Sequence, residues 1–274
     1  MEFGPLLRRA FILVSLSSIA RLASADPYAY ELSGADRFGL ANLATGSFSP
    51  IGGTLSTSLW GIAAGPGGAI YGMGSDQTSL YQVDTSNGSL SFVGSLSFLS
   101  GEGGWVLGST ANGSLYVAGV DTVGNYSLYS INPTNASTNF IGSMGQIGGS
   151  VMGCSSGSSS LYVGSGQTLY SVDVTTGLTT AVGSGMGSLA GNGPGGLVEV
   201  GGTLYGGAWG EDPALTASII SIDQTAAATT FVSLQPGLTG RGCWGLAPAA
   251  VPEPSAFAAV GLGLAGLAVR RRRK

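Results

Sequence analysis

Leu80–Gly94 reads LYQVDTSNGSLSFVG, and this arrangement of residues occurs five times in the chain. Each copy has an apolar residue, Asp or Asn, three further residues, Gly or Ala, and an apolar segment that ends in Gly or Ser. The Asp or Asn of each copy, called the anchor, is Asn42, Asp84, Asn132, Asp173 or Asp223. These anchors lie 42, 48, 41 and 50 residues apart. A period of about 40–50 residues is typical of the four-stranded blade of a β-propeller.

The chemistry of each copy predicts a tight turn between two strands. The anchor side chain should hydrogen-bond the turn backbone, and Gly four positions later permits a positive φ. Ile or Val, nine positions after every anchor, suits a half-buried strand. A second strand is expected before each anchor, at Ala29-Tyr30, Ile70-Tyr71, Leu115-Tyr116, Leu161-Tyr162 and Leu204-Tyr205. Innermost strands are expected at Trp60–Ala63, Trp105–Leu107, Val151–Gly153 and Leu197–Val200.

The two ends of the repeat region complement each other. The first unit lacks an innermost strand, whereas the last is followed by Cys243–Ala247, which closely repeats Trp60–Ala63. We therefore expect an all-β, five-bladed β-propeller of four-stranded antiparallel blades over residues 26–250. Its C-terminal strand would pair with the N-terminal blade and remove exposed edges. An open solenoid and a β-sandwich are the alternatives, but a solenoid gives no reason for the extra strand and a sandwich needs no repeat.

Residues 1–25 have the layout of a secretory signal peptide. Arg8 and Arg9 are followed by the apolar segment Ala10–Ala20. The small residues Ala23 and Ala25 mark a cleavage site, so the mature chain should begin at Asp26. The alternative is a buried N-terminal helix, but the order of these blocks is the one that the Sec export machinery requires.

Residues 251–274 contain three blocks in a fixed order. The first block is Val251, Pro252, Glu253, Pro254 and Ser255. An uncharged segment at 256–269 follows, and the chain ends in Arg270, Arg271, Arg272, Arg273 and Lys274. The apolar segment is expected to form a membrane helix, and the basic cluster should stay on the cytoplasmic side.

This C-terminal layout resembles the PEP-CTERM sorting signal of Gram-negative bacteria. The resemblance implies recognition by an exosortase, a membrane-embedded transpeptidase similar to cysteine proteases, which would cut near Pro252–Pro254. It also implies release to the cell surface or to an extracellular matrix rich in exopolysaccharide. The apolar segment has fourteen residues, including three glycines, whereas a spanning helix needs about 20. These properties favour transient anchoring in the inner membrane over an ordinary tail anchor.

The charge of the body excludes several functions. Between residues 26 and 250 there are twelve acidic residues but only Arg37 and Arg241 as cations, so the net charge is about −10. Such a surface cannot neutralise phosphates, so we expect no nucleic-acid partner. The chain has no histidine, which excludes Ser-His-Asp catalysis and His-ligated metal sites. We expect no cofactor and no metal, although loop carboxylates at Asp121 and Glu211-Asp212 leave calcium open.

Four residues are candidates for ligand binding. Trp60, Trp105 and Trp244 recur at one repeat position, where they would either pack near the axis or form a sugar-stacking surface at one mouth of the channel. Glu199 lies on an expected innermost strand, and Glu102 precedes another. A glycoside hydrolase would need two such carboxylates about 5–9.5 Å apart. Cys154 and Cys243 fall on innermost strands of non-adjacent blades and are candidates for a disulfide if the channel is narrow.

These observations favour a non-enzymatic, exported structural or adhesive module at the cell surface or in the matrix. A lectin-like propeller that binds carbohydrate is the first alternative. A propeller glycoside hydrolase that uses Glu102 and Glu199 is the second.

Overall fold

The fold of the described residues is all-β. The computed structural model describes residues 26–34, 36–99, 101–145, 147, 151–186, 194–208, 218–235 and 242–249. This part contains strands β1 to β20 and one short 3-10 turn, η1 (Pro66–Gly68). It includes no helix long and apolar enough to cross a membrane. The segment 256–269, expected to be a membrane helix, lies outside the described residues, as does the signal peptide at 1–25.

The strands form three four-stranded sheets and one eight-stranded sheet. The first four-stranded sheet contains, in spatial order, β20 (Cys243–Pro248), β1 (Tyr28–Ser33), β2 (Arg37–Asn42) and β3 (Phe48–Thr54). The next contains β4 (Leu59–Ala64), β5 (Ile70–Gly74), β6 (Ser79–Val83) and β7 (Leu90–Ser95). The third contains β8 (Gly103–Ser109), β9 (Leu115–Val120), β10 (Tyr126–Ile131) and β11 (Thr138–Ser143).

The eight-stranded sheet consists of two antiparallel groups joined by a short parallel contact. Its first group contains β12 (Val151–Ser156), β13 (Leu161–Ser165), β14 (Thr168–Val172) and β15 (Thr179–Gly183). Its second group contains β16 (Pro194–Val200), β17 (Thr203–Ala208), β18 (Ser218–Ile222) and β19 (Thr229–Leu234). Only Ser155 and Ser156 of β12 pair with β16, through Leu197 and Val198. Each group therefore repeats the four-stranded antiparallel unit.

The anchor turns have the predicted geometry. Asp84 Oδ1 accepts a hydrogen bond from the backbone N–H of Ser86 at 2.8 Å, and the Asp84 carbonyl oxygen accepts one from Gly88 at 2.7 Å. Corresponding bonds form at all five anchors. The residue four positions after the anchor has a positive φ every time, including 59° at Ala136 and 56° at Ala227. The role predicted for the anchors is confirmed.

A β-bulge explains why the Ile or Val nine positions after the anchor is half-buried. Leu80 pairs with Gly94 and Tyr81 pairs with Phe92, so Val93 is the extra residue of β7. Strands β11, β15 and β19 repeat this bulge at the same position. Because a bulge breaks the strict in-and-out alternation of side chains, Phe92 points to solvent and is 59% exposed.

The Gly or Ser that ends each copy lies against the anchor turn of a neighbouring sheet. A Cβ atom at Gly52 would overlap the carbonyl oxygen of Asn87, which immediately precedes Gly88. The same close approach joins Gly94 to Asn135, Gly142 to Thr176 and Gly183 to Ala226. A fifth approach joins Leu234, beside Ser233, to Gly46 in the turn of the first sheet. The absence of side chains here lets two backbones meet.

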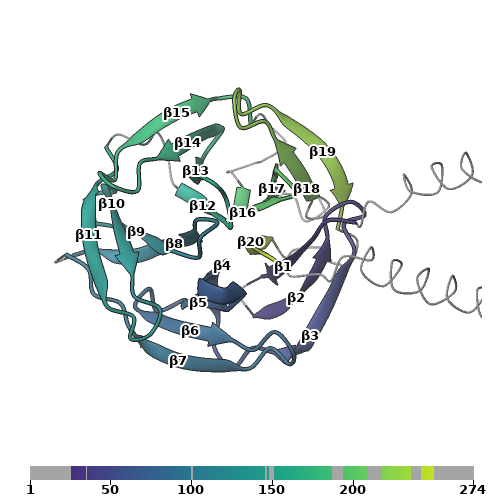
Figure 1. Ribbon diagram of the computed structural model, residues 1–274, viewed down its shortest axis with the longest axis horizontal. Coiled ribbons are helices and arrows are strands. Elements are labelled where there is room, and N and C mark those ends of the chain that lie inside the picture. Colours follow the sequence, from purple (N-terminus) through teal and green to yellow (C-terminus); the bar gives the residue numbers. More distant parts are fainter. Residues whose placement is uncertain are drawn as a thin grey trace, which may run out of the picture. The chain divides into compact units, whose positions relative to one another are not determined.

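The innermost strands contact one another in sequence. Figure 1 shows β4, β8, β12, β16 and β20 nearest the centre of the strand arrangement, with β3, β7, β11, β15 and β19 outermost. Contacts join β4 to β8, β8 to β12, β12 to β16, β16 to β20 and β20 to β4. Strand β20 also pairs antiparallel with β1, from Ala29 opposite Pro248 to Ser33 opposite Cys243.

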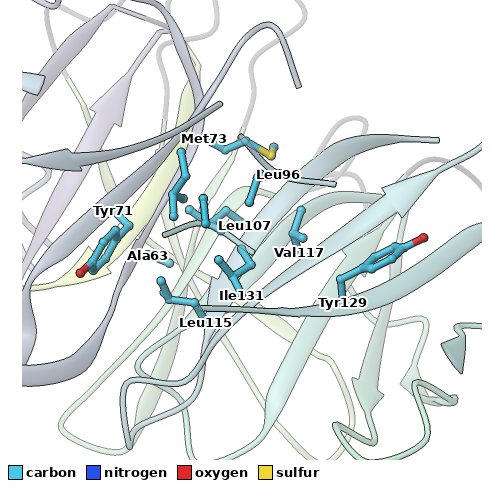
Figure 2. Close-up of a cluster of buried hydrophobic side chains, with 11 residues drawn as sticks. Ala63, Tyr71, Met73, Leu96, Leu107, Leu115, Val117, Tyr129 and Ile131 are labelled. Atoms are coloured by element: carbon cyan, nitrogen blue, oxygen red, sulfur yellow. The ribbon is translucent and has the colours of Figure 1, made fainter. Parts of the chain in front are cut away.

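Apolar residues fill the spaces between adjacent sheets. Figure 2 shows one such cluster, in which Met73 of the second sheet packs with Leu107 and Val117 of the third. Leu96, the first residue after β7, is only 4% exposed and belongs to the same cluster. Burial of a Leu side chain stabilises a fold by about 1.5–3 kcal/mol, so these clusters are the main source of cohesion between the sheets.

We predict that Gly52→Ala destabilises the protein by about 2–4 kcal/mol, because the new Cβ meets the Asn87 carbonyl oxygen while φ is +72°. The neighbouring Gly53→Ala is the control, since nothing lies within 4 Å of a Cβ there, and surface changes are usually within about 0.5 kcal/mol. Urea unfolding of both variants measures the difference. Equal midpoints would contradict the close approach of the sheets.

Candidate functional site

Each innermost strand carries a β-bulge near its beginning, and the bulged residue occupies the same place every time. In β4, Leu59 pairs with Gly74 and Gly61 pairs with Met73, which leaves Trp60 as the extra residue. The equivalent extra residues of the other innermost strands are Trp105, Met152, Gly195 and Trp244. Bulges re-aim side chains and are frequent beside binding sites. Sequence analysis placed the three tryptophans at one repeat position, but it did not identify Met152 and Gly195 as their counterparts.

The three tryptophans form one aromatic cluster. The rings of Trp60 and Trp105 lie 5.3 Å apart, edge to face, and those of Trp60 and Trp244 lie 6.3 Å apart at a tilt of 57°. All three side chains are half-buried. Each one also packs against a different apolar cluster between the sheets. Both sequence interpretations therefore apply, because the tryptophans support the core and also present ring surface near the axis.

A small pocket lies beside the tryptophan cluster. It has about 200 Å³ of empty space, and its lining includes Trp60, Trp244, Gly153, Gly195 and Gly196. Small-molecule sites usually measure about 300–1,000 Å³, so this space does not enclose a whole sugar chain. Aromatic rings on one side and glycine backbone on the other suit partial insertion of one flat, apolar face.

Serine side chains bridge the opposite ends of the innermost strands. Ser156 Oγ accepts a hydrogen bond from the backbone N–H of Ala64 at 2.9 Å and lies 3.1 Å from Ser109 Oγ. Ser109 Oγ in turn accepts one from the N–H of Gly157 at 3.1 Å. Since β4 and β12 are separated by β8 in the order of contacts, the bond to Ala64 passes over the axis. The tryptophan end is consequently the better candidate for a ligand, and sequence analysis gave no signal for the serine bridge.

The two carboxylates considered for glycan cleavage serve separate hydrogen-bond networks. Glu102 Oε1 accepts from Ser127 Oγ at 2.9 Å, and its Oε2 accepts from Tyr129 OH at 2.5 Å. Glu199 Oε2 accepts from Ser158 Oγ at 2.8 Å and from Gln224 Nε2 at 3.3 Å. Burial, reinforced by the hydrogen bond to Glu102, raises the pKa of Tyr129 to about 12.

The two carboxylates also lie toward opposite ends of the innermost strands. Parallel bridges join β8 to β12 and β12 to β16. Glu102 precedes the first residue of β8, whereas Glu199 is the next-to-last residue of β16. Because these strands run in the same direction, the two carboxylates do not flank one cleft as a glycosidase pair would.

The anchor aspartates act in turn formation. A hydrogen bond from the hydroxyl two residues later, followed by one from the backbone of that residue, lowers the pKa of Asp84, Asp173 and Asp223. Asp121, a calcium candidate, instead accepts bonds from Asn125 and the Val123 backbone. No group of three or more acidic or cysteine side chains suitable for a metal occurs in the described ranges. Glu211-Asp212 lie outside them.

The disulfide considered for Cys154 and Cys243 does not form, and that expectation is corrected. Both side chains are buried on innermost strands as expected, yet no disulfide joins them. The Cys154 sulfur faces Gly108 of β8, whereas the Cys243 sulfur faces Gly207 of β17. The two thiols thus pack into different spaces between sheets. Burial raises the pKa of Cys154 to about 12, which keeps this thiol protonated and unreactive.

The C-terminal residues match a known sorting signal. Residues 250–273 match the family described as the PEP-CTERM protein-sorting motif. The chain therefore carries the signal of an exosortase substrate, which implies export and transient membrane anchoring through its C-terminal end. The motif residues Val251–Ser255, the basic cluster Arg270–Lys274 and the signal-cleavage residues Ala23 and Ala25 all lie outside the described part of the structure.

Comparison with solved structures finds similar folds at low sequence identity. A protein of unknown function from Bacteroides caccae is 11% identical, with a TM-score of 0.48 over 83% of this chain and 100% of that one. TolB from Acinetobacter baumannii is 13% identical, with a TM-score of 0.48 over 85% and 60%. Hydrazine synthase from Kuenenia stuttgartiensis is 16% identical, with a TM-score of 0.43 over 64% and 49%. No curated protein matches the sequence.

Proposed function

We propose that the body is a five-bladed β-propeller closed by its own C-terminal strand. The unbroken order of contacts among the innermost strands supports this architecture. The antiparallel register of β20 with β1 supplies the fourth strand of the first sheet. The approach of Leu234 to Gly46 repeats, between the last and first sheets, the contact that joins every other adjacent pair. Closure of this kind leaves no innermost edge open to association with other chains.

The body then functions as a non-enzymatic adhesive or structural module at the cell surface or in the exopolysaccharide matrix. The sorting motif at 250–273 is the observation that carries this proposal, because it delivers the body outward without a permanent anchor. The separation of Glu102 from Glu199 toward opposite strand ends favours binding over glycan cleavage.

Carbohydrate binding at the tryptophan cluster is the second candidate function. The observation that favours it is the placement of Trp60, Trp105 and Trp244 at bulges, with ring surface left at one end of the axis. Stacking on aromatic rings requires an apolar sugar face rather than charge. The body carries a net charge of about −10, which repels anionic polymers. A neutral glycan is therefore the expected ligand, and its binding should change little with salt.

We predict that replacing Pro252, Glu253 and Pro254 with Ala keeps the protein in the cell envelope with its C-terminal segment attached, because the exosortase loses its recognition site. The measurement is immunoblotting of envelope and medium from the native host, with mass spectrometry of the C-terminal peptide. Wild-type protein in a host that lacks its exosortase is the matched control and should behave like the variant. Release of the triple variant in processed form at the wild-type level would contradict the sorting account.

We predict that Trp60→Ala weakens binding of neutral exopolysaccharide about thirtyfold, since truncating a central aromatic contact typically costs at least about 2 kcal/mol. Trp60 contacts both other rings, so its loss disrupts the whole cluster. Affinity electrophoresis in polysaccharide gels measures the change, and circular dichroism checks folding. Trp60→Phe should keep most of the affinity.

Phe92→Ala is the control for general surface stickiness, because Phe92 is 59% exposed on the outermost strand β7. An equal loss in Phe92→Ala and Trp60→Ala would contradict a defined site at the tryptophan cluster. Shortening of the polysaccharide by wild-type protein, abolished in Glu102→Gln, would favour the glycosidase alternative instead.

A further inference from the structure

The space between the last and first sheets, called the closing seam, differs from the other four in polarity. Four buried side-chain atoms of the described residues lack a hydrogen-bond partner: Glu31 Oε1, Ser33 Oγ, Ser233 Oγ and Gln235 Oε1. All four belong to this seam. Glu31 and Ser33 lie on the same face of β1 as Ala29, which packs against Val198 and Ile219 of the last sheet. Ser233 pairs with Ile219, and Gln235 donates a 2.6 Å hydrogen bond from Nε2 to Glu31 Oε2.

The other seams have apolar residues at the place of Gln235. The buried residue that follows the outermost strand is Leu55, Leu96, Met144 or Met186 in the other four. The residue of the second strand that corresponds to Glu31, by its pairing with the innermost strand, is Gly72, Val117, Val163 or Gly206. In Figure 2, Leu96 and Val117 illustrate this apolar pairing in one cluster. The closing seam thus has a Gln–Glu pair where another seam has Leu with Val.

We propose that Glu31 and Gln235 form a proton-controlled latch that holds the closing seam shut when Glu31 is protonated and weakens it when Glu31 is ionised. The proposal rests on the ring closure proposed above. A buried carboxylate with one hydrogen bond is poorly compensated for the loss of water, whereas a neutral carboxyl is tolerated. A latch at this position acts on the only seam that joins the two ends of the body.

The electrostatic surroundings of Glu31 support this control. Burial raises the pKa of Glu31 from 4.5 to about 7, although the hydrogen bond from Gln235 opposes the change. On β20, Cys243 is the titratable neighbour, and burial followed by the Glu31 charge raises the pKa of its thiol, which stays neutral. On the other packed strands, Arg37 of β2 is exposed, Tyr205 of β17 is half-buried, and Glu199 of β16 is bound by Ser158 and Gln224. Arg241 lies outside the described residues.

The sign of the effect follows from linkage. Because the pKa is raised in the closed seam, this contribution to stability is complete below pH 4.5 and is lost as pH rises through about 7. With these two values, the equilibrium for opening the seam increases roughly tenfold between pH 6 and pH 8.

The two buried cysteines provide a local readout of that opening. Cys243 lies in the closing seam, whereas Cys154 lies in the apolar cluster between β8–β11 and β12–β15. The full-length protein is alkylated with iodoacetamide at pH 6 and pH 8, and mass spectrometry gives the labelling rate at each cysteine. The ratio of the two rates removes the intrinsic pH dependence of thiol reactivity, which both share once exposed.

We expect the Cys243-to-Cys154 ratio to increase roughly tenfold from pH 6 to pH 8 in wild-type protein and to stay constant in Glu31→Gln. Glu102→Gln, which changes a half-buried carboxylate in another sheet, is the matched control and should keep the wild-type response. The double variant Glu31→Val with Gln235→Leu recreates the Val117–Leu96 pairing. Its Cys243 should be labelled slowly and equally at both pH values.

Two outcomes overturn the proposal in different ways. A constant ratio in wild-type protein with both thiols protected, or an unchanged pH response in Glu31→Gln, would refute the latch and leave the closed ring intact. Labelling of Cys243 at the rate of an unprotected thiol at both pH values, in wild type and in the double variant, would refute the ring closure itself.

Discussion

The close approach of two backbones at Gly52, Gly94, Gly142, Gly183 and Leu234 is the constraint on which the architecture depends. At each of these places the outermost strand of one sheet meets the anchor turn of another. A side chain would separate the sheets and leave gaps in the apolar clusters between them, and interiors do not tolerate such gaps without a cost. The repeated Asp or Asn turn and the repeated terminal Gly are therefore two sides of one contact.

The same repetition produces the candidate site. Every innermost strand has its bulge at one position, so a Trp, Met or Gly placed there reaches the end of the axis regardless of the rest of the sheet. Fold and function are separable here, because the bulged residue varies while the ladder on either side is kept. Delivery is separate again, since it depends on the motif at 250–273.

Much of the fold was predictable from the sequence because the repeat carries its own local chemistry. Asp84 and its counterparts declare a turn through residue type and spacing alone, and Cys243–Ala247 declares a missing strand by resembling Trp60–Ala63. The site was harder to predict. Met152 and Gly195 share no chemistry with Trp60, so only the register shows that they are equivalent. The disulfide prediction was wrong because nearness along an axis does not fix which way a cysteine faces, and Glu31 gave no signal because one acidic residue in a strand is ordinary.

Hydrogen exchange at the backbone amides of β20 tests the central account most directly. If the C-terminal strand completes the first sheet, Gly245, Leu246 and Ala247 should exchange only by unfolding of the whole body, as slowly as the amides of β9 in the middle of another sheet. If β20 instead exchanges by local opening, many-fold faster than β9 while β4–β7 stay protected, the ring is not closed by its two ends and the account is contradicted.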